Sequence, residues 1–365
     1  MITTTRQIFI SVGIQFNTTL SQYLFDFENS QTMSMAEALR LTKNDPAVTN
    51  NSQRRLVFFI GDPAMKIPLA APDIIATKIN NEDIATTTTP LQALSPAKIE
   101  GFVSDDQGNI LNSYNGTLTA TIYDKNIQRT TLGNDGTFFN GQLITMDYEA
   151  LGEVLFRGQA SVENGEFEIN FIIPRDIVIP VGNGKISFYS KTDVPLSDQR
   201  GYNFDIKIGG VNLDAPADSS CPNIELYMND DSFVSGGITN ENPTLIAKLY
   251  DENGINTSSG VGHDIVALID GDETNPYILN DYYIADLDSY QSGTLSYPLR
   301  NLSPGQHTLS LKAWDVYNNG CTKEIQFTVF DQNESLELTN VLNYPNPFIN
   351  YTEFWFNHNS SCLLY

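Results

Sequence analysis

The spacing of apolar residues changes near residue 72. Before that point, apolar residues recur every three or four positions or form an unbroken run, whereas after it they alternate with polar residues in short stretches separated by Asn, Asp and Gly. Recurrence every three or four positions is typical of helices, and strict alternation is typical of half-buried strands. The pattern therefore predicts a multidomain protein, with an α/β segment followed by mostly antiparallel β-sandwich structure.

Residues 1–72 predict strands and helices in alternation. Arg6–Val12 predicts a strand that ends at Gly13, and residues 18–28 predict a helix. One face of that helix is apolar, with residues at positions i, i+3, i+4 and i+7: Leu20, Tyr23, Leu24 and Phe27.

A second helix is predicted to begin at Ser34. Ser34 and Glu37 have the spacing of a capping box, in which the serine hydroxyl accepts from the amide of residue 37 and the Glu37 carboxylate accepts from the amide of residue 34. Asn44, Asp45 and Pro46 then predict the end of the helix.

The run Leu56–Ile60 is apolar without alternation and stops at Gly61–Pro63. Such a run predicts a strand in a sheet that helices cover on both faces. Two strands and two helices cannot supply that cover. Leaving the run half covered forgoes a sum on the order of 10 kcal/mol, which equals the whole stability of a typical domain. We therefore expect residues 1–72 to be the C-terminal remnant of a larger domain.

Residues 73–214 predict a linker followed by a β-sandwich. Strands are expected at Gly116–Tyr123, Gly165–Phe171 and Gly184–Tyr189. The second alternates, with one face apolar and the other polar, and the dipeptide Asn164–Gly165 before it is typical of a hairpin turn.

Residues 215–332 predict an immunoglobulin-like sandwich that follows a polar, proline-bearing joint at Asp214–Pro222. The expected strands are short and regularly spaced, as in such sandwiches: Asn223–Met228, Pro243–Tyr250, Asp264–Asp270, Gly293–Leu299, Gly305–Asp315 and Lys323–Phe330. In the fifth strand, His307, Leu309, Leu311 and Ala313 are expected to face inward. Residues 333–365 predict the start of a further β-module.

Composition narrows the function classes. The chain has 365 residues, 41% of them apolar, and carries 44 acidic against 20 basic residues, a formal charge of −24. Binding to nucleic acid or to anionic membranes relies on clustered Lys and Arg, which are scarce here. No stretch approaches the roughly 20 apolar residues of a membrane-spanning helix, and residues 1–13 lack the layout of a secretory signal. We expect a surface or secreted protein without a direct membrane span.

The cysteines and histidines do not predict a catalytic pair. The three cysteines are Cys221, Cys321 and Cys362, and the three histidines are His263, His307 and His358. All six fall in the β-rich part, away from residues 1–72. Their spacing excludes a disulfide framework and leaves one bridge open. The favoured interpretation is that Cys321 packs and the other two are incidental, so we predict no catalytic and no cofactor-binding residue.

Several turns carry acidic residues that are candidate calcium ligands. Asp251, Asn253, Asp270 and Asp272 could supply oxygen ligands, but the twelve-residue loop with a terminal Glu is absent. Because Asp and Asn are also the usual turn formers, turn chemistry is the favoured interpretation and calcium the alternative. Gly61–Pro63 is similarly interpreted as a structural turn at the end of a strand rather than as part of a cleft.

Several segments carry a resemblance to a known family. Thr3–Phe9 and Phe58–Ile67 resemble the closing strands of gingipain-type cysteine peptidases, whose fold is caspase-like. The remainder is similar to the sortases of the type IX secretion system in Bacteroidota, on these motifs: Asn229–Asn240, Asp251–Asn256, Gly262–Ile265, Leu279–Tyr283 and Val341–Phe348.

The resemblance implies a cysteine endopeptidase on the extracellular face of the outer membrane. It would remove C-terminal signal domains from exported proteins and work with outer-membrane components of the secretion system. In the family, the catalytic Cys and His precede the strand that corresponds to Arg6–Val12, so this chain is expected to be inactive alone. The alternative is a non-enzymatic β-sandwich adhesin or docking module at the outer membrane.

Overall fold

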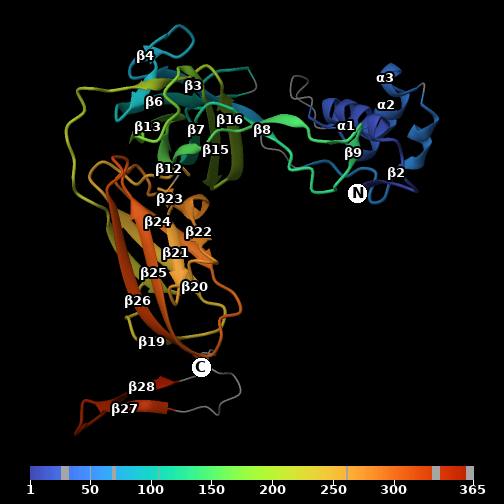
Figure 1. Cartoon of the computed structure of the whole chain (residues 1–365). Helices are drawn as coiled ribbons and strands as arrows, with labels where there is room; N and C mark the ends of the chain where they lie inside the picture. Colours follow the sequence, from blue (N-terminus) through green and yellow to red (C-terminus); the bar gives the residue numbers. More distant parts are fainter. Residues whose placement is uncertain are drawn as a thin grey trace. The chain divides into compact units, whose positions relative to one another are not determined.

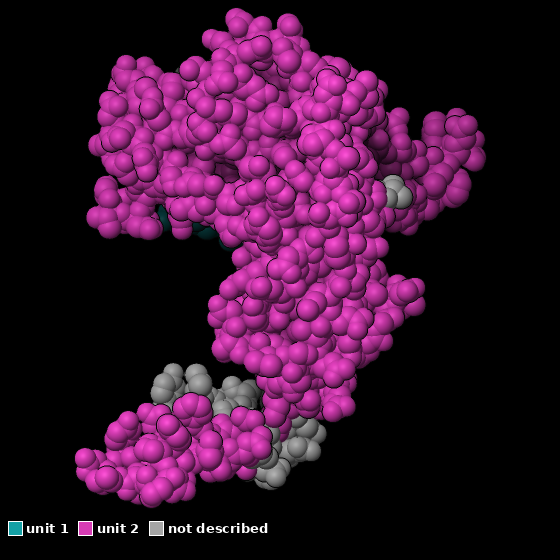
Figure 2. Space-filling view, turned by 90° about the vertical axis from the view of Figure 1, so that its left-hand side faces the viewer, with its two compact units in different colours: residues 1–72 teal, residues 73–365 magenta. Residues whose placement is uncertain are grey.

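A computed structural model describes residues 1–25, 33–49, 51–67, 71–105, 107–259, 262–330 and 338–358. The chain is mostly β-structure (Figure 1). It divides into two compact units, Met1–Pro72 and Asp73–Tyr365, which Figure 2 colours separately. No helix among the described residues is long and apolar enough to span a membrane.

The first unit combines short helices with one pair of strands. Its elements are β1 (Ile2–Thr4), α1 (Ile10–Leu24), α2 (Met35–Asn44), α3 (Pro46–Thr49), the 3₁₀ helix η1 (Ser52–Leu56) and β2 (Val57–Phe59). A small core holds them together: Phe16, Leu20, Ala38, Leu39, Val48 and Val57. Helices this short depend on tertiary packing for their stability.

The strand predicted at Arg6–Val12 is wrong. Helix α1 already begins at Ile10, and its buried residues Val12, Phe16 and Leu20 are spaced by four, so the helical period extends upstream of the predicted start at residue 18. Ile8, Phe9 and Ile10 have strand-like composition, but the packing of the helix decides their structure. The helix ends at Leu24, and Phe27 lies outside the described residues.

The second helix begins and ends where the sequence predicted. Ser34 is its N-cap and its side chain accepts from the amide of Glu37 at 3.3 Å, while Asp45 follows the last helical residue. The Glu37 carboxylate forms a two-point contact with the Arg40 guanidinium, at 2.6 and 2.8 Å, in place of the predicted return to residue 34.

Strand β2 lies open within its unit. Among the described residues it pairs only with β1, antiparallel, with Ile2 opposite Phe59 and Thr4 opposite Val57. Val57 is buried, whereas Phe58 and Phe59 are half-buried and Ile60 is 52% exposed. The first unit therefore does not enclose the apolar run that the sequence predicted to be covered on both faces.

The region predicted as a linker and a β-sandwich is instead a closed barrel, here called the barrel lobe (residues 71–211). Seven strands follow one another around it: β16 (Leu196–Asn203), β15 (Lys185–Asp193), β7 (Gly116–Tyr123), β12 (Val154–Glu163), β13 (Glu166–Ile172), β6 (Pro96–Val103) and β3 (Ala71–Ile79). Strand β3 also pairs with β16, which closes the ring. The segment interpreted as a linker thus supplies the strand that closes the ring.

Short strands complete this lobe. Strand β4 (Glu82–Asp83) pairs antiparallel with the end of β3. Strands β5 (Leu91–Ala93), β14 (Gly182–Asn183) and β17 (Lys207–Val211) form a small separate sheet. Two ladders lie between β7 and β12 in sequence: β8 (Ile127–Thr130) with β11 (Asp147–Ala150), and β9 (Phe138–Phe139) with β10 (Gln142–Leu143).

The alternation predicted for β13 is confirmed. Phe167, Ile169 and Phe171 are buried, and the residues between them are exposed. Asn164 and Gly165 have φ of 52° and 82°, the left-handed values that a two-residue hairpin turn requires.

Residues 223–329 form two sheets, here called the two-sheet lobe. One contains β18 (Asn223–Met228), β20 (Thr244–Tyr250), β24 (Ser292–Pro298) and β23 (Tyr283–Ala285), in that order. The other contains β19 (Gly237–Thr239), β26 (Gly320–Val329), β25 (Gly305–Trp314), β21 (Val266–Ile269) and β22 (Tyr277–Ile278). The 3₁₀ helix η2 (Asn280–Tyr282) precedes β23.

The predicted inward face of β25 is confirmed for its apolar residues. Leu309, Leu311 and Ala313 are buried, and His307 on the same face is half-buried. Further along the chain, β27 (Leu338–Tyr344) and β28 (Glu353–His358) form an antiparallel hairpin.

Candidate functional site

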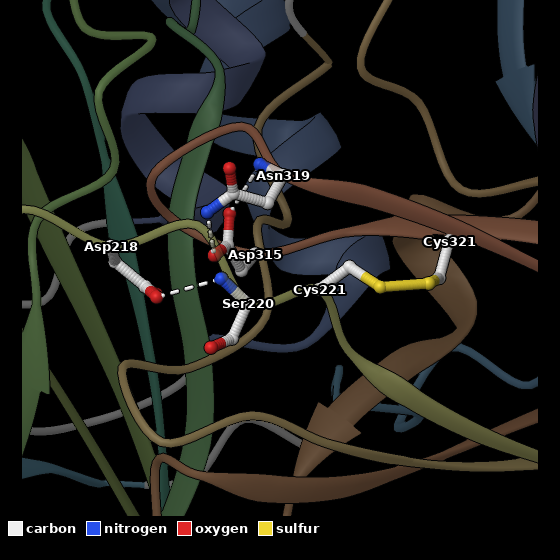
Figure 3. Close-up of a disulfide and its surroundings, with 6 residues drawn as sticks. All are labelled: Asp218, Ser220, Cys221, Asp315, Asn319 and Cys321. Atoms are coloured by element: carbon white, nitrogen blue, oxygen red, sulfur yellow. Dashed lines mark hydrogen bonds between the residues drawn. A yellow bond between two sulfur atoms is a disulfide. The ribbon is translucent and has the colours of Figure 1, made fainter.

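Two of the three cysteines are joined in a disulfide. Cys221 and Cys321 are bonded, with their Cα atoms 5.5 Å apart and a sequence separation of 100 (Figure 3). The interpretation that Cys321 only packs and Cys221 is incidental is therefore wrong. Neither sulfur is a free thiol, so neither can act as a nucleophile in this state. Cys362 lies outside the described residues.

Two histidines form hydrogen bonds to carboxylates, and neither contacts a thiol among the described residues. His263 Nδ1 lies 2.7 Å from Asp176 Oδ2, and the imidazole makes an edge contact with the Trp314 ring. His307 Nδ1 lies 2.7 Å from Asp270 Oδ2. The side chain of His358 lies outside the described residues. Within the described part of the chain, no histidine pairs with a free cysteine thiol as nucleophilic catalysis requires.

An acidic cluster of three residues lies beside the disulfide. Asp218, Asp251 and Asp315 come from the joint before β18, from the end of β20 and from the end of β25, and their carboxylate oxygens lie within 4.8 Å of one another. Asp251 is 4% exposed and Asp315 is fully buried. Figure 3 shows Asp218 and Asp315 approaching each other from separate loops.

Each carboxylate of the acidic cluster caps a local turn. Asp218 accepts from the amide of Ser220 at 2.9 Å and Asp251 from the amide of Asn253 at 2.8 Å, two residues on in both cases. Asp315 accepts from Asn319 four residues on, through both the backbone amide (2.6 Å) and the side-chain amide (2.8 Å). These are the side-chain-to-backbone bonds expected of Asp in turns.

The disulfide fastens the two loops that carry Asp218 and Asp315. Cys221 follows Asp218 closely, and Cys321 lies directly beyond Asn319, the residue that binds the Asp315 carboxylate (Figure 3). The Asn253 side chain adds a link, since it donates to Asp218 Oδ2 at 2.8 Å. The three carboxylates are therefore held together by their turns, by the disulfide and by the side-chain amide of Asn253, despite their mutual repulsion.

Burial sets the electrostatics of the acidic cluster. It raises the pKa of Asp251 to about 6, with a further contribution from the charges of Asp315 and Asp218. Burial also raises the pKa of Asp315, against the bonds from Asn319. The amide of Ser220 and the side chain of Asn253 lower the pKa of Asp218. Asp251 and Asp315 therefore hold a proton more tightly than an isolated aspartate does, and Asp218 holds one less tightly.

The structure separates the residues predicted as calcium ligands. Asp251 and Asn253 lie at the acidic cluster, but Asp270 binds the amide of Thr308 and the imidazole of His307, and Asp272 caps its own turn at Thr274. Asp218 and Asp315 were missed. Hard oxygen donors of this kind suit Ca²⁺, yet the turn bonds above account for each carboxylate, as the favoured interpretation expected.

Gly61–Pro63 forms the turn that the sequence indicated. Asp62 Oδ1 accepts from the amide of Ala64 at 2.9 Å, and Gly61 has φ of 138°, which favours glycine. This turn follows the end of β2.

Comparison with known proteins bears on the first unit above all. The family model of Peptidase family C25 matches residues 1–68, which confirms the resemblance of this segment to the gingipain-type peptidases. No curated protein matches the chain significantly.

Among solved structures, the chain is similar to dimeric latent PorU from Porphyromonas gingivalis, with 28% identity, 90% of this chain covered and a TM-score of 0.43. It covers 31% of that PorU chain, about a third of its length. Fibronectin(III)-like modules of CbhA from Clostridium thermocellum match at 10% identity, with 70% and 93% of the two chains covered and a TM-score of 0.19. A 1.5-MDa bacterial ice-binding adhesin also matches at 10%, with 75% and 70% covered and a TM-score of 0.19. The last two likenesses carry no argument about function.

Proposed function

We propose that this chain is the C-terminal part of a cysteine endopeptidase similar to PorU, which acts at the cell surface and removes C-terminal signal domains from exported proteins. The single observation that carries the proposal is the match of Peptidase family C25 to residues 1–68, which falls within the compact unit Met1–Pro72. A family match that coincides with a unit of the fold supports a shared domain rather than a chance motif.

The first unit would be the end of a caspase-like domain. Its two strands form an isolated antiparallel pair, and the apolar run at β2 is only partly covered, with Ile60 half exposed. Burying such side chains contributes about 1.5–3 kcal/mol each, so further strands and helices of the same domain are the natural cover. The catalytic Cys and His would lie on those elements.

The two-sheet lobe would be an immunoglobulin-like module. Its sheet order β18-β20-β24-β23 corresponds to the strand order A-B-E-D of that fold. In the other sheet, β26, β25 and β21 correspond to G, F and C, and β19 pairs in parallel with β26. The order of pairing thus supports the finer assignment. The module and the barrel lobe would hold the exported substrate or contact outer-membrane components of the secretion system.

A hybrid enzyme tests the proposal. Residues 1–365 replace the matching third of P. gingivalis PorU, and cleavage of an exported protein carrying its C-terminal signal domain is followed by mass spectrometry. We expect the hybrid to cleave at the PorU site and the 365-residue chain alone to show no turnover. A matched hybrid with Val57→Asp, which disrupts the core of the first unit, should lose activity, whereas Ser52→Asp, at an exposed polar position of the same unit, is the control for a surface change.

Two results would overturn the proposal. Thiol-dependent turnover by the chain alone would place the catalytic pair within these residues. A hybrid that folds and is secreted but does not cleave, while the chain alone binds to cells, would favour the non-enzymatic docking or adhesin role.

A further inference from the structure

The barrel lobe has one incomplete seam, between β12 and β13. The two strands leave the Asn164–Gly165 turn as a hairpin, but within the described residues their ladder contains only two pairs, Val162 with Phe167 and Glu163 with Glu166. Strand β12 extends back to Val154 and β13 extends on to Ile172. The two strands therefore diverge beyond the first pairs, although each keeps a full ladder with its other neighbour.

The loop after β23 completes the β12 side of this seam. The amide of Asp288 donates to the Gln159 carbonyl at 3.0 Å, and the Asp288 carboxylate accepts from the amide and the hydroxyl of Ser161, at 2.7 and 2.6 Å. Leu287 forms a parallel bridge with Gln159. Figure 1 shows β23, which precedes this loop, beside β12. The Gln159 carbonyl and the Ser161 amide of β12 are thus satisfied by the two-sheet lobe.

The β13 side of the seam keeps a free edge. In an antiparallel ladder, alternate residues direct their N–H and C=O groups to opposite neighbours. Because the amide of Val103 donates to the carbonyl of Gly165, the residues of β13 at odd positions bond to β6. Glu168 and Asn170 therefore direct their backbone groups toward the seam, where the described part of β12 offers them no ladder partner.

A cleft follows this edge. A cavity of about 210 Å³ lies between Gln159 and Asp288 on one side and Glu168 and Asn170 on the other. A second cavity of about 480 Å³ continues from it, since Glu168 and Asp288 line both. The two diverging strands thus leave a gap, and one wall of the gap carries backbone groups without ladder partners. An extended peptide can add as a strand to an edge of this kind.

The charge of the cleft indicates the kind of peptide. Glu163 and Glu166 lie directly opposite each other in the ladder, an unfavourable pair of like charges. Glu100 Oε2 is buried, and among the described residues it has no hydrogen-bond partner. Lys98, which bridges Glu100 and Glu168, is already engaged, and Lys78 is the basic residue on the lining of the larger cavity. The lining therefore keeps an excess of carboxylates, which favours a cationic occupant.

We propose that the edge of β13 between Glu168 and Ile172 is a docking site for an extended segment of a partner protein that carries lysine or arginine. The segment adds as a strand to the backbone of Glu168 and Asn170, and its basic side chains reach Glu163, Glu166 and the buried oxygen of Glu100. This interaction is separate from proteolysis and does not depend on the proposed peptidase activity.

Model peptides test the proposal on the whole 365-residue chain. The probe is a capped hexapeptide of alternating valine and lysine. Its controls are the valine–glutamate analogue and a valine–lysine peptide that is N-methylated at every residue, which has no backbone N–H to donate. Binding is followed by fluorescence anisotropy at two salt concentrations. We expect the first peptide to bind with an affinity that falls as salt rises, and both controls to bind at least about tenfold more weakly.

A proline substitution identifies the edge itself. Asn170→Pro removes a seam-facing N–H without removing a bond to β6, and Asn170→Ala is its matched control, because it keeps the N–H and loses only the side chain. We expect at least about tenfold weaker binding for the proline variant and about twofold or less for the alanine variant. Hydrogen exchange at the amides of Glu168 and Asn170 should slow when the lysine peptide is added.

Three outcomes would overturn the proposal. They are the absence of binding by the lysine peptide, equal binding by the N-methylated or glutamate peptide, and unchanged exchange at Glu168 and Asn170 in the presence of bound peptide. Hydrogen exchange in the unbound wild type gives a test that does not depend on the folding of the proline variant. The amides of Glu168 and Asn170 should exchange faster than those of Phe167 and Ile169.

Discussion

Removing the charge of Asp251 should stabilise the protein at neutral pH. The Asp251→Asn substitution keeps the oxygen that accepts from the amide of Asn253 and deletes a buried negative charge next to Asp218 and Asp315. A buried charge without a cationic partner is unfavourable. Asp251 and Asp315 are both almost fully buried.

The pKa gives the sign and the size of the effect. Burial raises the pKa of Asp251 from 3.8 to about 6, so the folded state favours the protonated form. The stability from this preference is fully present below pH 4 and is lost as the pH rises through about 6. The difference between 3.8 and about 6, at about 1.36 kcal/mol for each pH unit, is roughly 3 kcal/mol.

Urea unfolding at two pH values measures the effect. Trp314 directly precedes Asp315, so its fluorescence reports on the two-sheet lobe, and the experiment is done in chelator at pH 4.5 and 7.5. We expect Asp251→Asn to exceed the wild type in unfolding free energy by up to about 3 kcal/mol at pH 7.5 and by about 1 kcal/mol at pH 4.5. Asp272→Asn is the matched control, since the side chain of Asn275 and Thr274 lower the pKa of Asp272 and its removal should not stabilise.

Equal stability of the two proteins at pH 7.5 in chelator would refute the reasoning from burial. Repeating the measurement with added calcium separates turn chemistry from metal binding at the same residues. If turn chemistry is the whole account, calcium leaves the unfolding free energy of both proteins unchanged. A rise for the wild type that Asp251→Asn abolishes would instead assign calcium to the acidic cluster.

Two further predictions concern other contacts of the two-sheet lobe. Replacing both Cys221 and Cys321 by serine should lower the unfolding free energy by about 2–5 kcal/mol, because the bridge closes a loop of about 100 residues; unchanged urea midpoints of the double variant and the wild type under oxidising conditions would contradict this. His307→Gln should cost roughly 1–2 kcal/mol more at pH 5.5 than at pH 9. Although burial alone would lower the pKa of His307, the carbonyl of Ser303 and the carboxylate of Asp270 raise it. The stabilising contribution of His307 is therefore present at low pH and lost as the pH rises through its raised pKa. An NMR titration of the imidazole checks that the pKa is raised.

Local pattern was sufficient wherever neighbouring residues decide the structure. The strand at Gly116–Tyr123 and the alternation in β13 follow from the side-chain period alone. Ser34 and Asp45 bound a helix because caps act within a few residues. The turn at Asn164–Gly165 follows from the φ values that these two residue types accept.

Pattern failed where tertiary packing decides between two local preferences. Ile8, Phe9 and Ile10 have strand-forming side chains, yet Val12 lies on the buried face of a helix with Phe16 and Leu20. The helical face extends over more residues than the strand-like stretch, so its burial outweighs the local preference. A longer window for the helical period would have detected this.

The remaining features depend on partners that are distant in sequence. The segment at Ala71–Ile79 lies where a linker was predicted, and its pairing with the distant strands β6 and β16 makes it the strand that closes the barrel. The same holds for Asp218 and Asp315, which meet Asp251 through the folding of separate loops. A single sequence shows which residues are aspartates but not which of them meet in the fold. A turn-forming aspartate and a member of a buried acidic cluster therefore cannot be distinguished until the topology is known. The free edge of β13 belongs to this class as well, because it exists only where two strands that the hairpin turn predicts to be paired move apart.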